Sequence, residues 1–324
     1  MKSCFLSLVI CLGATFIAPV EAAPLTIPLV SVGNAGNASD PLTGLGAVAY
    51  NYQIGKNEIT VFQYATFLNA KAKSDLYGLY NPSMESDLNH AGIIRSGVSG
   101  TYKYSVVTGR SQFPITYVSW FDAARFCNWL HNGQGYGSTE TGAYTLKGAM
   151  SGIIRKTKVA KYWIPSLHEW YKAALYDPTK NGLGGYWLYA TQTDVLSGNS
   201  RAVAGSANYF DGDYVGSGTS TLPTGIAITA VGSYGLGSDS YYGTNDQAGN
   251  AMEWNDAVIA SSARGVRGGA WFSKAADLRS SVGKSYSPTG EYGGVGFRIA
   301  NNSPSKSSLL LIFSSGLITL RRKR

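Results

Sequence analysis

The chain has 324 residues, 44% hydrophobic and 14% charged, with a formal net charge of +8. Six cations (Lys2, Lys306 and those at 321–324) and one anion, Glu21, lie at the two ends, so the body between them carries 21 cations and 18 anions, a net of +3. A near-balanced body of this size is long enough for one large core, and it lacks the concentrated basic face of a nucleic-acid-binding protein, so we expect no nucleic-acid partner.

Residues 1–22 have the pattern of a secretory signal peptide. A positive start is followed by the largely apolar stretch 4–16, and Val20-Glu21-Ala22 places small residues where a signal peptidase reads. A membrane anchor is the alternative, but the apolar run is short for a membrane span. We therefore expect cleavage after Ala22 and export of the protein.

The first half of the body predicts strands and three capped helices. Residues 23–48 indicate a first strand and a flexible loop, and the alternation at 49–54 predicts a second strand. A capping box, Thr60 with Gln63, opens a helix over Val61 to about Lys71. Its expected inner face carries Phe62, Ala65, Leu68 and Ala72. Helices after Ser119 and after Ser166 follow, with inward positions expected at Trp120, Ala123, Ala124, Cys127 and Leu130, and at Trp170, Ala173 and Ala174.

The rest of the body is rich in turns. Residues 72–112 and 132–160 read as strands and loops, and 182–256 are dominated by Gly, Tyr, Ser and Thr. Strands and helices do not alternate regularly, which favours an α+β fold over a doubly wound sheet. Cys127 is the only thiol left after signal removal, so no internal disulfide can form. Its place on the apolar helix face predicts a buried, unreactive side chain.

The C-terminal end combines an apolar run, residues 307–320, with four cations at 321–324. The run is short for a spanning helix, and the cations would stay on the cytoplasmic side of a membrane. This arrangement resembles the PEP-CTERM sorting tails of exported bacterial proteins, although Ser303-Pro304-Ser305 stands where those tails have Pro-Glu-Pro. The resemblance implies a membrane-associated tail cut by a sorting protease. The alternative is a last buried element of the domain.

Motifs spread over most of residues 50–300 resemble the sulfatase-modifying factor family, the formylglycine-generating enzymes and their relatives. They occur in family order: GKNEIT at 55–60, PITYVSW at 114–120, IPSLHEW at 164–170, Asn208-Tyr209, GNAMEW at 249–254, RGG at 267–269 and GFR at 296–298. Met252 replaces the first tryptophan of the family's GNVWEW motif. The resemblance implies one α+β, loop-rich domain with a C-type lectin-like fold. We divide the chain into a signal (1–22), a connecting segment (23–48), this domain (49–300) and the tail (301–324).

The same resemblance bears on the family's copper chemistry. Active oxidases of the family carry two cysteines after the RGG turn, and those positions hold Ser273 and Leu278 here. Leucine cannot ligate a metal, and a serine hydroxyl is a poor substitute for the thiolate that Cu(I) selects. We therefore expect no copper and no formylglycine-generating activity.

Calcium is the cofactor that the resemblance implies. Family members bind it through side chains matching Asp246 and Glu253 and through carbonyls matching Gly249 and Ala251, and Ca²⁺ accepts such mixed oxygen ligands. The alternative is that the two acids cap turns and bind arginines. A second family site would begin at Asn208 and the Tyr209 carbonyl, with Asp211 or Asp213 as its acidic partner.

Other candidate sites are weaker. The three histidines, His90, His131 and His168, are far apart, so surface or capping roles are expected. The glycine-rich stretch 265–269 lacks the lysine and the Ser/Thr of a phosphate loop.

Three functions remain open. The first is an exported non-oxidase that binds a peptide, glycan or protein ligand at the cell envelope, either tethered by the tail or released outside the cell. The second is a formylglycine-generating oxidase acting on sulfatase cysteines. The third is another enzyme on the same fold, as in the iron-dependent sulfoxide synthases, which need an extra helical domain for their iron. Fold alone does not decide among them, but because the paired cysteines are missing we rank the binding protein first and keep the two enzymes as alternatives.

Overall fold

This computed structural model describes residues 24–302, apart from 88, 91, 216–226, 236 and 261. The expected signal peptide and the tail at 303–324 lie outside the described residues. Within those residues, no helix combines the length and the apolar character needed to span a membrane.

All three expected capping boxes are present. The Thr60 hydroxyl accepts from the Gln63 amide, and the Gln63 side chain accepts from the Thr60 amide at 2.9 Å. Ser119 and Ser166 open the second and third of these helices in the same way. Because each box satisfies amides that the first helical turn leaves unpaired, it fixes where the helix begins. The helices are α1 (Val61–Lys71), the short α2 (Ser83–Ser86), α3 (Trp120–His131) and α4 (Leu167–Leu175).

The expected inner faces are confirmed for α3 and α4, and α1 needs one correction. Phe62 is 49% exposed, although the sequence pattern predicts it on the inner face. Val61, Tyr64 and Phe67 are buried instead. The buried stripe of α1 is therefore rotated toward the aromatic residues of α3, where Phe67 packs on Phe126 with ring centroids 5.4 Å apart.

Two four-stranded sheets and two hairpins complete the fold. The first sheet has the order β1-β2-β12-β5 and the second the order β10-β9-β8-β11, in which only β11 is parallel to its neighbour. The bounds are β1 Leu29–Val32, β2 Tyr52–Gly55, β3 Ile93–Ser96, β4 Lys103–Val106, β5 Tyr162–Trp163, β6 Tyr176–Asp177, β7 Gly185–Tyr186, β8 Met252–Ile259, β9 Ala263–Arg267, β10 Lys284–Tyr286, β11 Val295–Gly296 and β12 Ala300–Asn302. Two short 3₁₀ turns, η1 (Lys180–Gly182) and η2 (Ala275–Leu278), lie between strands.

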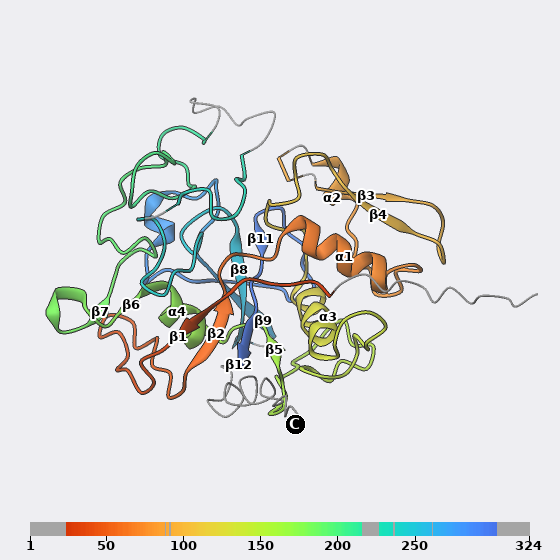
Figure 1. Cartoon of the computed structure of the whole chain (residues 1–324), viewed down its shortest axis with the longest axis horizontal. Coiled ribbons are helices and arrows are strands. Elements are labelled where there is room, and N and C mark those ends of the chain that lie inside the picture. The colour runs from red at the N-terminus through yellow and green to blue at the C-terminus, as the bar shows by residue number, and fades with distance from the viewer. Residues whose placement is uncertain are drawn as a thin grey trace, which may run out of the picture.

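The elements arrange the site around β8. In Figure 1, α1 and α3 lie together on one side of the sheets, and the loops between β7 and β8 fill the other side. No helix or strand occurs among the described residues between β7 and β8, which confirms the expected loop-rich segment. The result is one mixed α+β domain, as the sequence predicts, with its main core between the helices and the sheets.

Candidate functional site

The two positions of the family's cysteines are buried. The Ser273 side-chain oxygen accepts from the Ala270 amide at 3.0 Å, and the Ser273 carbonyl accepts from the Phe210 amide. Leu278 packs in an apolar cluster with Trp170 and Ala248. Gly269, with φ +73°, lets this turn close, because a Cβ there would lie 2.4 Å from a Leu278 methyl group. Neither position supplies a thiolate.

Cys127 cannot replace the missing thiols. It lies on α3, is fully buried and is free of any disulfide. Burial raises the pKa of its thiol well above the usual value. A nucleophilic or metal-binding cysteine instead needs a setting that favours the thiolate. The inert role expected from its helix position is consistent with this environment.

Glu253, on β8, forms a buried ion pair. Its two carboxylate oxygens accept from the Nε and Nη2 atoms of Arg298, each at 2.6 Å, and the Trp170 indole donates to Glu253 Oε2 at 2.7 Å. Arg298 also donates to the carbonyls of Gly55 and Asn245. This bidentate geometry is the strongest arrangement of an arginine with a carboxylate. Arg298 therefore ties the end of the domain to β2 and β8.

A third acid, Glu58, joins Asp246 and Glu253 in this interior. Glu58 is 1% exposed, Asp246 is 8% exposed, and the Glu58 Oε2 atom has no hydrogen-bond partner among the described residues. Burial raises the pKa of both carboxyls, and the charges of the neighbouring acids raise that of Glu58 further. Three carboxyls share one guanidinium here, so the interior has an excess of negative charge unless a proton or a cation offsets it.

The two expected calcium segments lie side by side. Asn208 and Gly249 form a parallel bridge, and the Asn250 amide donates to the Asn208 carbonyl at 2.8 Å. Gly249 has φ +81°, and a Cβ there would lie 2.1 Å from the Asn208 carbonyl oxygen, so only glycine allows this approach. The Asn250 side chain connects Asn208 with the buried acids: its Oδ1 atom accepts from Asn208, and its Nδ2 atom donates to Glu58 at 3.1 Å. The backbone of Gly249 to Ala251 thus runs between the two candidate sites.

The Asn208 side chain has the features of a ligand. It is 1% exposed, and its Nδ2 atom donates to the Ala227 carbonyl and to Asn250. Its Oδ1 atom has no partner among the described residues. The Tyr209 carbonyl accepts from Asn199, which also binds Asp213 Oδ1 at 2.9 Å. A buried amide oxygen without a partner and an unbalanced group of acids fit the hard oxygen ligands of Ca²⁺.

No set of three or more His, Cys, Asp or Glu side chains arranged to hold a metal occurs in the part of the chain that the structure describes. The first calcium site predicted from the sequence combines two carboxylates, Asp246 and Glu253, with two carbonyls. Both Glu253 oxygens bind Arg298 in the structure, which agrees with the alternative that this acid binds an arginine, and the calcium site stays a prediction. Glu58 and Arg298 lie inside the GKNEIT and GFR motifs, but the sequence alone indicates no site role for either residue. Both residues are far from Glu253 along the chain, so the sequence does not show that they meet it. The one indication in the sequence was that each family motif contains a charged residue.

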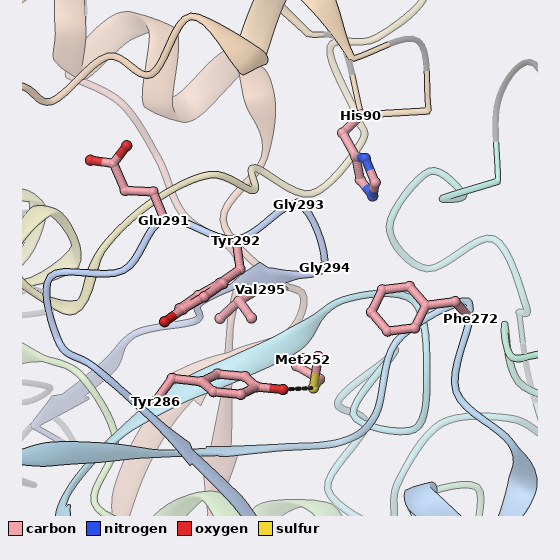
Figure 2. Close-up of a pocket in the computed structure, with 9 residues that line it drawn as sticks. All are labelled: His90, Met252, Phe272, Tyr286, Glu291, Tyr292, Gly293, Gly294 and Val295. Atoms are coloured by element: carbon pink, nitrogen blue, oxygen red, sulfur yellow. Dashed lines mark hydrogen bonds between the residues drawn. The ribbon is translucent and has the colours of Figure 1, made fainter.

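A pocket of about 410 Å³ opens beside β8 and β11 (Figure 2). Two residues on its wall, Phe272 and Tyr292, are 43% and 36% exposed. The other lining residues are buried or half-buried. The rings of Tyr286 and Tyr292 lie 4.8 Å apart, and Tyr286 Oη points to the Met252 sulfur at 4.0 Å. The lining residues are His90, Met252, Phe272, Tyr286, Glu291, Tyr292, Gly293, Gly294 and Val295. Apolar walls with a few polar groups are typical of ligand pockets.

His90 lies at one end of this pocket, and this corrects the surface or capping role expected from the sequence. Its side chain is 6% exposed, and its Nδ1 atom lies 3.0 Å from Asp87 Oδ2. The Trp271 indole donates to His90 Nε2 at 2.9 Å. Because an indole can only donate, Nε2 is unprotonated and Nδ1–H donates to Asp87. Burial lowers the pKa of His90, which favours the same neutral form. Tyr117, with φ +58°, donates to the same Asp87 oxygen.

Comparison with known proteins gives a family and a fold. The family described as "Sulfatase-modifying factor enzyme 1-like domain" matches residues 34–303. The crystal structure of CarF is similar with a TM-score of 0.51 and 20% identity, over 86% of this chain and 99% of that chain. At this identity the likeness establishes the fold alone.

Two further structures have lower scores. Treponema denticola variable protein 1 has a TM-score of 0.49 and 18% identity over 85% of this chain and 95% of its own. PvdO from Pseudomonas aeruginosa has a TM-score of 0.49 and 16% identity over 87% of this chain and 100% of its own. No curated protein matches the chain.

Proposed function

Given that the chain belongs to the sulfatase-modifying factor enzyme 1-like domain family, we propose that it is an exported member that binds a ligand and does not act as a formylglycine-generating oxidase. The observation that carries this proposal is the burial of Ser273 and Leu278 where the family resemblance places two cysteines. A copper-dependent oxidase needs paired thiolates that are open to its substrate, and neither side chain can supply one.

The pocket beside β8 supports the binding half of the proposal. Its exposed aromatic side chains are Phe272, which directly precedes Ser273 in the chain, and Tyr292, so a surface for a ligand lies beside one of the positions where the thiols are missing. A concave, mostly apolar site with polar groups at its ends is the common form of a binding pocket. The ligand would be part of a peptide, a glycan or another protein.

Calcium would act as a structural ion in this protein. Asp246, Glu253 and the carbonyls of Gly249 and Ala251 would hold one ion, and Asn208 with the Tyr209 carbonyl would begin a second site. When bound, the ion supplies positive charge to buried carboxylates and cross-links loops that have little regular structure. Asn208 Oδ1 and Glu58 Oε2, both buried without a partner among the described residues, support this assignment.

The proposed location is the cell envelope. The signal at 1–22 would direct export, and the apolar run with its terminal cations would hold the protein at the membrane until a sorting protease cuts near Ser303-Pro304-Ser305.

The oxidase alternative has a direct test. Purified mature protein, loaded with Cu(I), is incubated with a Cys-x-Pro-x-Arg peptide under oxygen, and the peptide mass is measured. We expect no aldehyde product and no stoichiometric copper, because the only mature thiol, Cys127, is buried. A Cys127→Ala variant serves as the control for copper held by that thiol. Formation of the aldehyde would overturn the proposed function.

A further inference from the structure

We infer that the pocket beside β8 takes an organic cation, an ammonium group on an apolar stem. This inference rests on the proposed binding function and names the ligand class for it. It starts from the rings that line the pocket. The rings of Tyr286 and Tyr292 are tilted by 39° with centroids 4.8 Å apart, and Phe272 is 43% exposed at the opposite wall. The faces of such rings carry negative potential and attract cations.

Elsewhere in the described structure the protein supplies its own cations to aromatic rings. The Arg264 guanidinium lies 3.7 Å from the Trp120 ring centroid, and Lys156 Nζ lies 3.8 Å from that of Trp163. No lysine or arginine lines the pocket, and none of the cation–ring contacts among the described residues involves its three rings. The pocket therefore has the rings of a cation site without an internal cation.

Glu291 is the acidic residue of the pocket, and its negative charge favours a positively charged ligand. Glu291 is among the residues around the pocket, although its carboxylate points away from the three rings (Figure 2) and its Oε2 atom accepts from the Asn81 side chain. Burial raises the pKa of Glu291, and the negative charge of Asp75 adds to the rise. No cation offsets this carboxylate among the described residues, so a bound ammonium group would stabilise its ionised form.

The remaining lining fits an apolar stem. Met252 is 4% exposed and lies between Tyr286 and Phe272 (Figure 2). Gly294 allows the backbone of this wall to pack closely against Phe272, because a Cβ at position 294 would lie 2.5 Å from the Phe272 ring. Tyr286 Oη has only the weakly accepting Met252 sulfur as its partner among the described residues, so it remains able to bond a polar group of the ligand.

Three probes of similar shape test the charge requirement: benzylammonium, benzyl alcohol and benzoate. Binding is followed by NMR of ¹³C-methyl methionine in the mature protein, whose methionines are Met84, Met150 and Met252. We expect benzylammonium to shift the Met252 signal at millimolar concentration, benzyl alcohol to bind roughly tenfold more weakly, and benzoate to bind least. The buried Met84 and the exposed Met150 report whether any shift is confined to the pocket.

Two variants locate the site. Glu291→Gln should reduce the affinity for benzylammonium to that for benzyl alcohol, whereas Asp239→Asn, which removes the same charge outside the pocket, should leave it unchanged. Met252→Trp should fill the pocket and abolish binding, with a thermal melt to confirm that it is folded.

Equal binding of benzylammonium and benzyl alcohol at Met252 would overturn the cation inference and leave the proposed ligand-binding function standing. Unchanged binding in Glu291→Gln, or no shift of Met252 with any probe, would also overturn the inference. The oxidase test is independent of all these outcomes.

Discussion

At the scale of single residues, the buried acids are the most informative part of the molecule. Glu253 is committed to Arg298 by two hydrogen bonds of 2.6 Å. Removing it would leave a buried guanidinium unpaired, which typically costs about 3–5 kcal/mol whether or not calcium binds. Asp246 accepts from the Gly232 amide, lies beside the Glu58 carboxyl and forms no ion pair among the described residues, so its charge can be removed with less damage. It is therefore the better residue for testing the ion.

We predict that calcium raises the melting temperature of the mature protein relative to chelator. An ion at a hundred times its dissociation constant stabilises the native state by about 2.7 kcal/mol if it does not bind the unfolded chain. Asp246→Asn keeps the side-chain shape but removes one charge, and it should shrink this response. Asp277→Asn, at a half-exposed ion pair with Lys284, is the matched control. Superimposable melting curves with calcium and with chelator in the unmutated protein would rule out the site.

At the scale of elements, capping decides where the helices start, and the cap of α3 contains an aspartate with a raised pKa. The Asp122 side chain accepts from the Ser119 amide at 2.8 Å and closes the first turn of α3. Burial raises the pKa of Asp122 to about 7, and the charge of Glu291 contributes to the rise. The capping residue Asp122 therefore interacts electrostatically with Glu291, which lines the pocket.

We predict that this cap makes stability fall as pH rises. The folded protein holds the Asp122 proton up to about pH 7, whereas a solvated aspartate loses it near 3.8. Over that range the folded state binds more protons than the unfolded state, so the free energy of unfolding decreases with increasing pH and levels off above about 7.

Urea unfolding from pH 4 to 8 measures this slope. Asp122→Asn should flatten it, because the amide keeps a hydrogen-bonding oxygen but cannot ionise. Asp256, whose pKa burial also raises to about 7, should leave a residual slope in that variant. A slope identical in the variant and the unmutated protein would contradict the assignment to Asp122.

At the scale of the whole molecule, the last strand ties the two ends of the domain together. β12 lies between β2 and β5, with Ala300 paired to both Ile54 and Trp163. The family match ends at residue 303, just after this strand. The chain from 303 onward lies outside the described residues, so its proposed sorting role depends on its sequence alone.

We predict that a chain ending at Asn302 folds and is released in soluble form into the periplasm or medium, because every strand of the described sheets remains. A chain ending at Ile299 lacks β12 and should fail to fold, since β2 and β5 lose their shared partner. Fractionation and circular dichroism compare the two. Aggregation of the longer chain would show that the tail belongs to the core and would refute the sorting proposal.

Much of the fold could be predicted because its signals are local. The capping boxes at Thr60, Ser119 and Ser166 need only residues three apart, and each begins a helix in the structure. The same local view failed at Phe62, since the helical period alone does not tell which side the core occupies. Among the described residues, the absence of regular elements between β7 and β8 was likewise foreseeable from composition.

The sequence by itself determined the family, the helix starts and the lack of paired thiols, because each depends on which residue stands at a given position in a motif. Only the tertiary structure decided that Glu58 and Arg298 meet Asp246 and Glu253, and that His90 faces the ring of Trp271. These partners are separated by long stretches of chain. Their contacts exist only after the loops have packed, so no local pattern of residues records them.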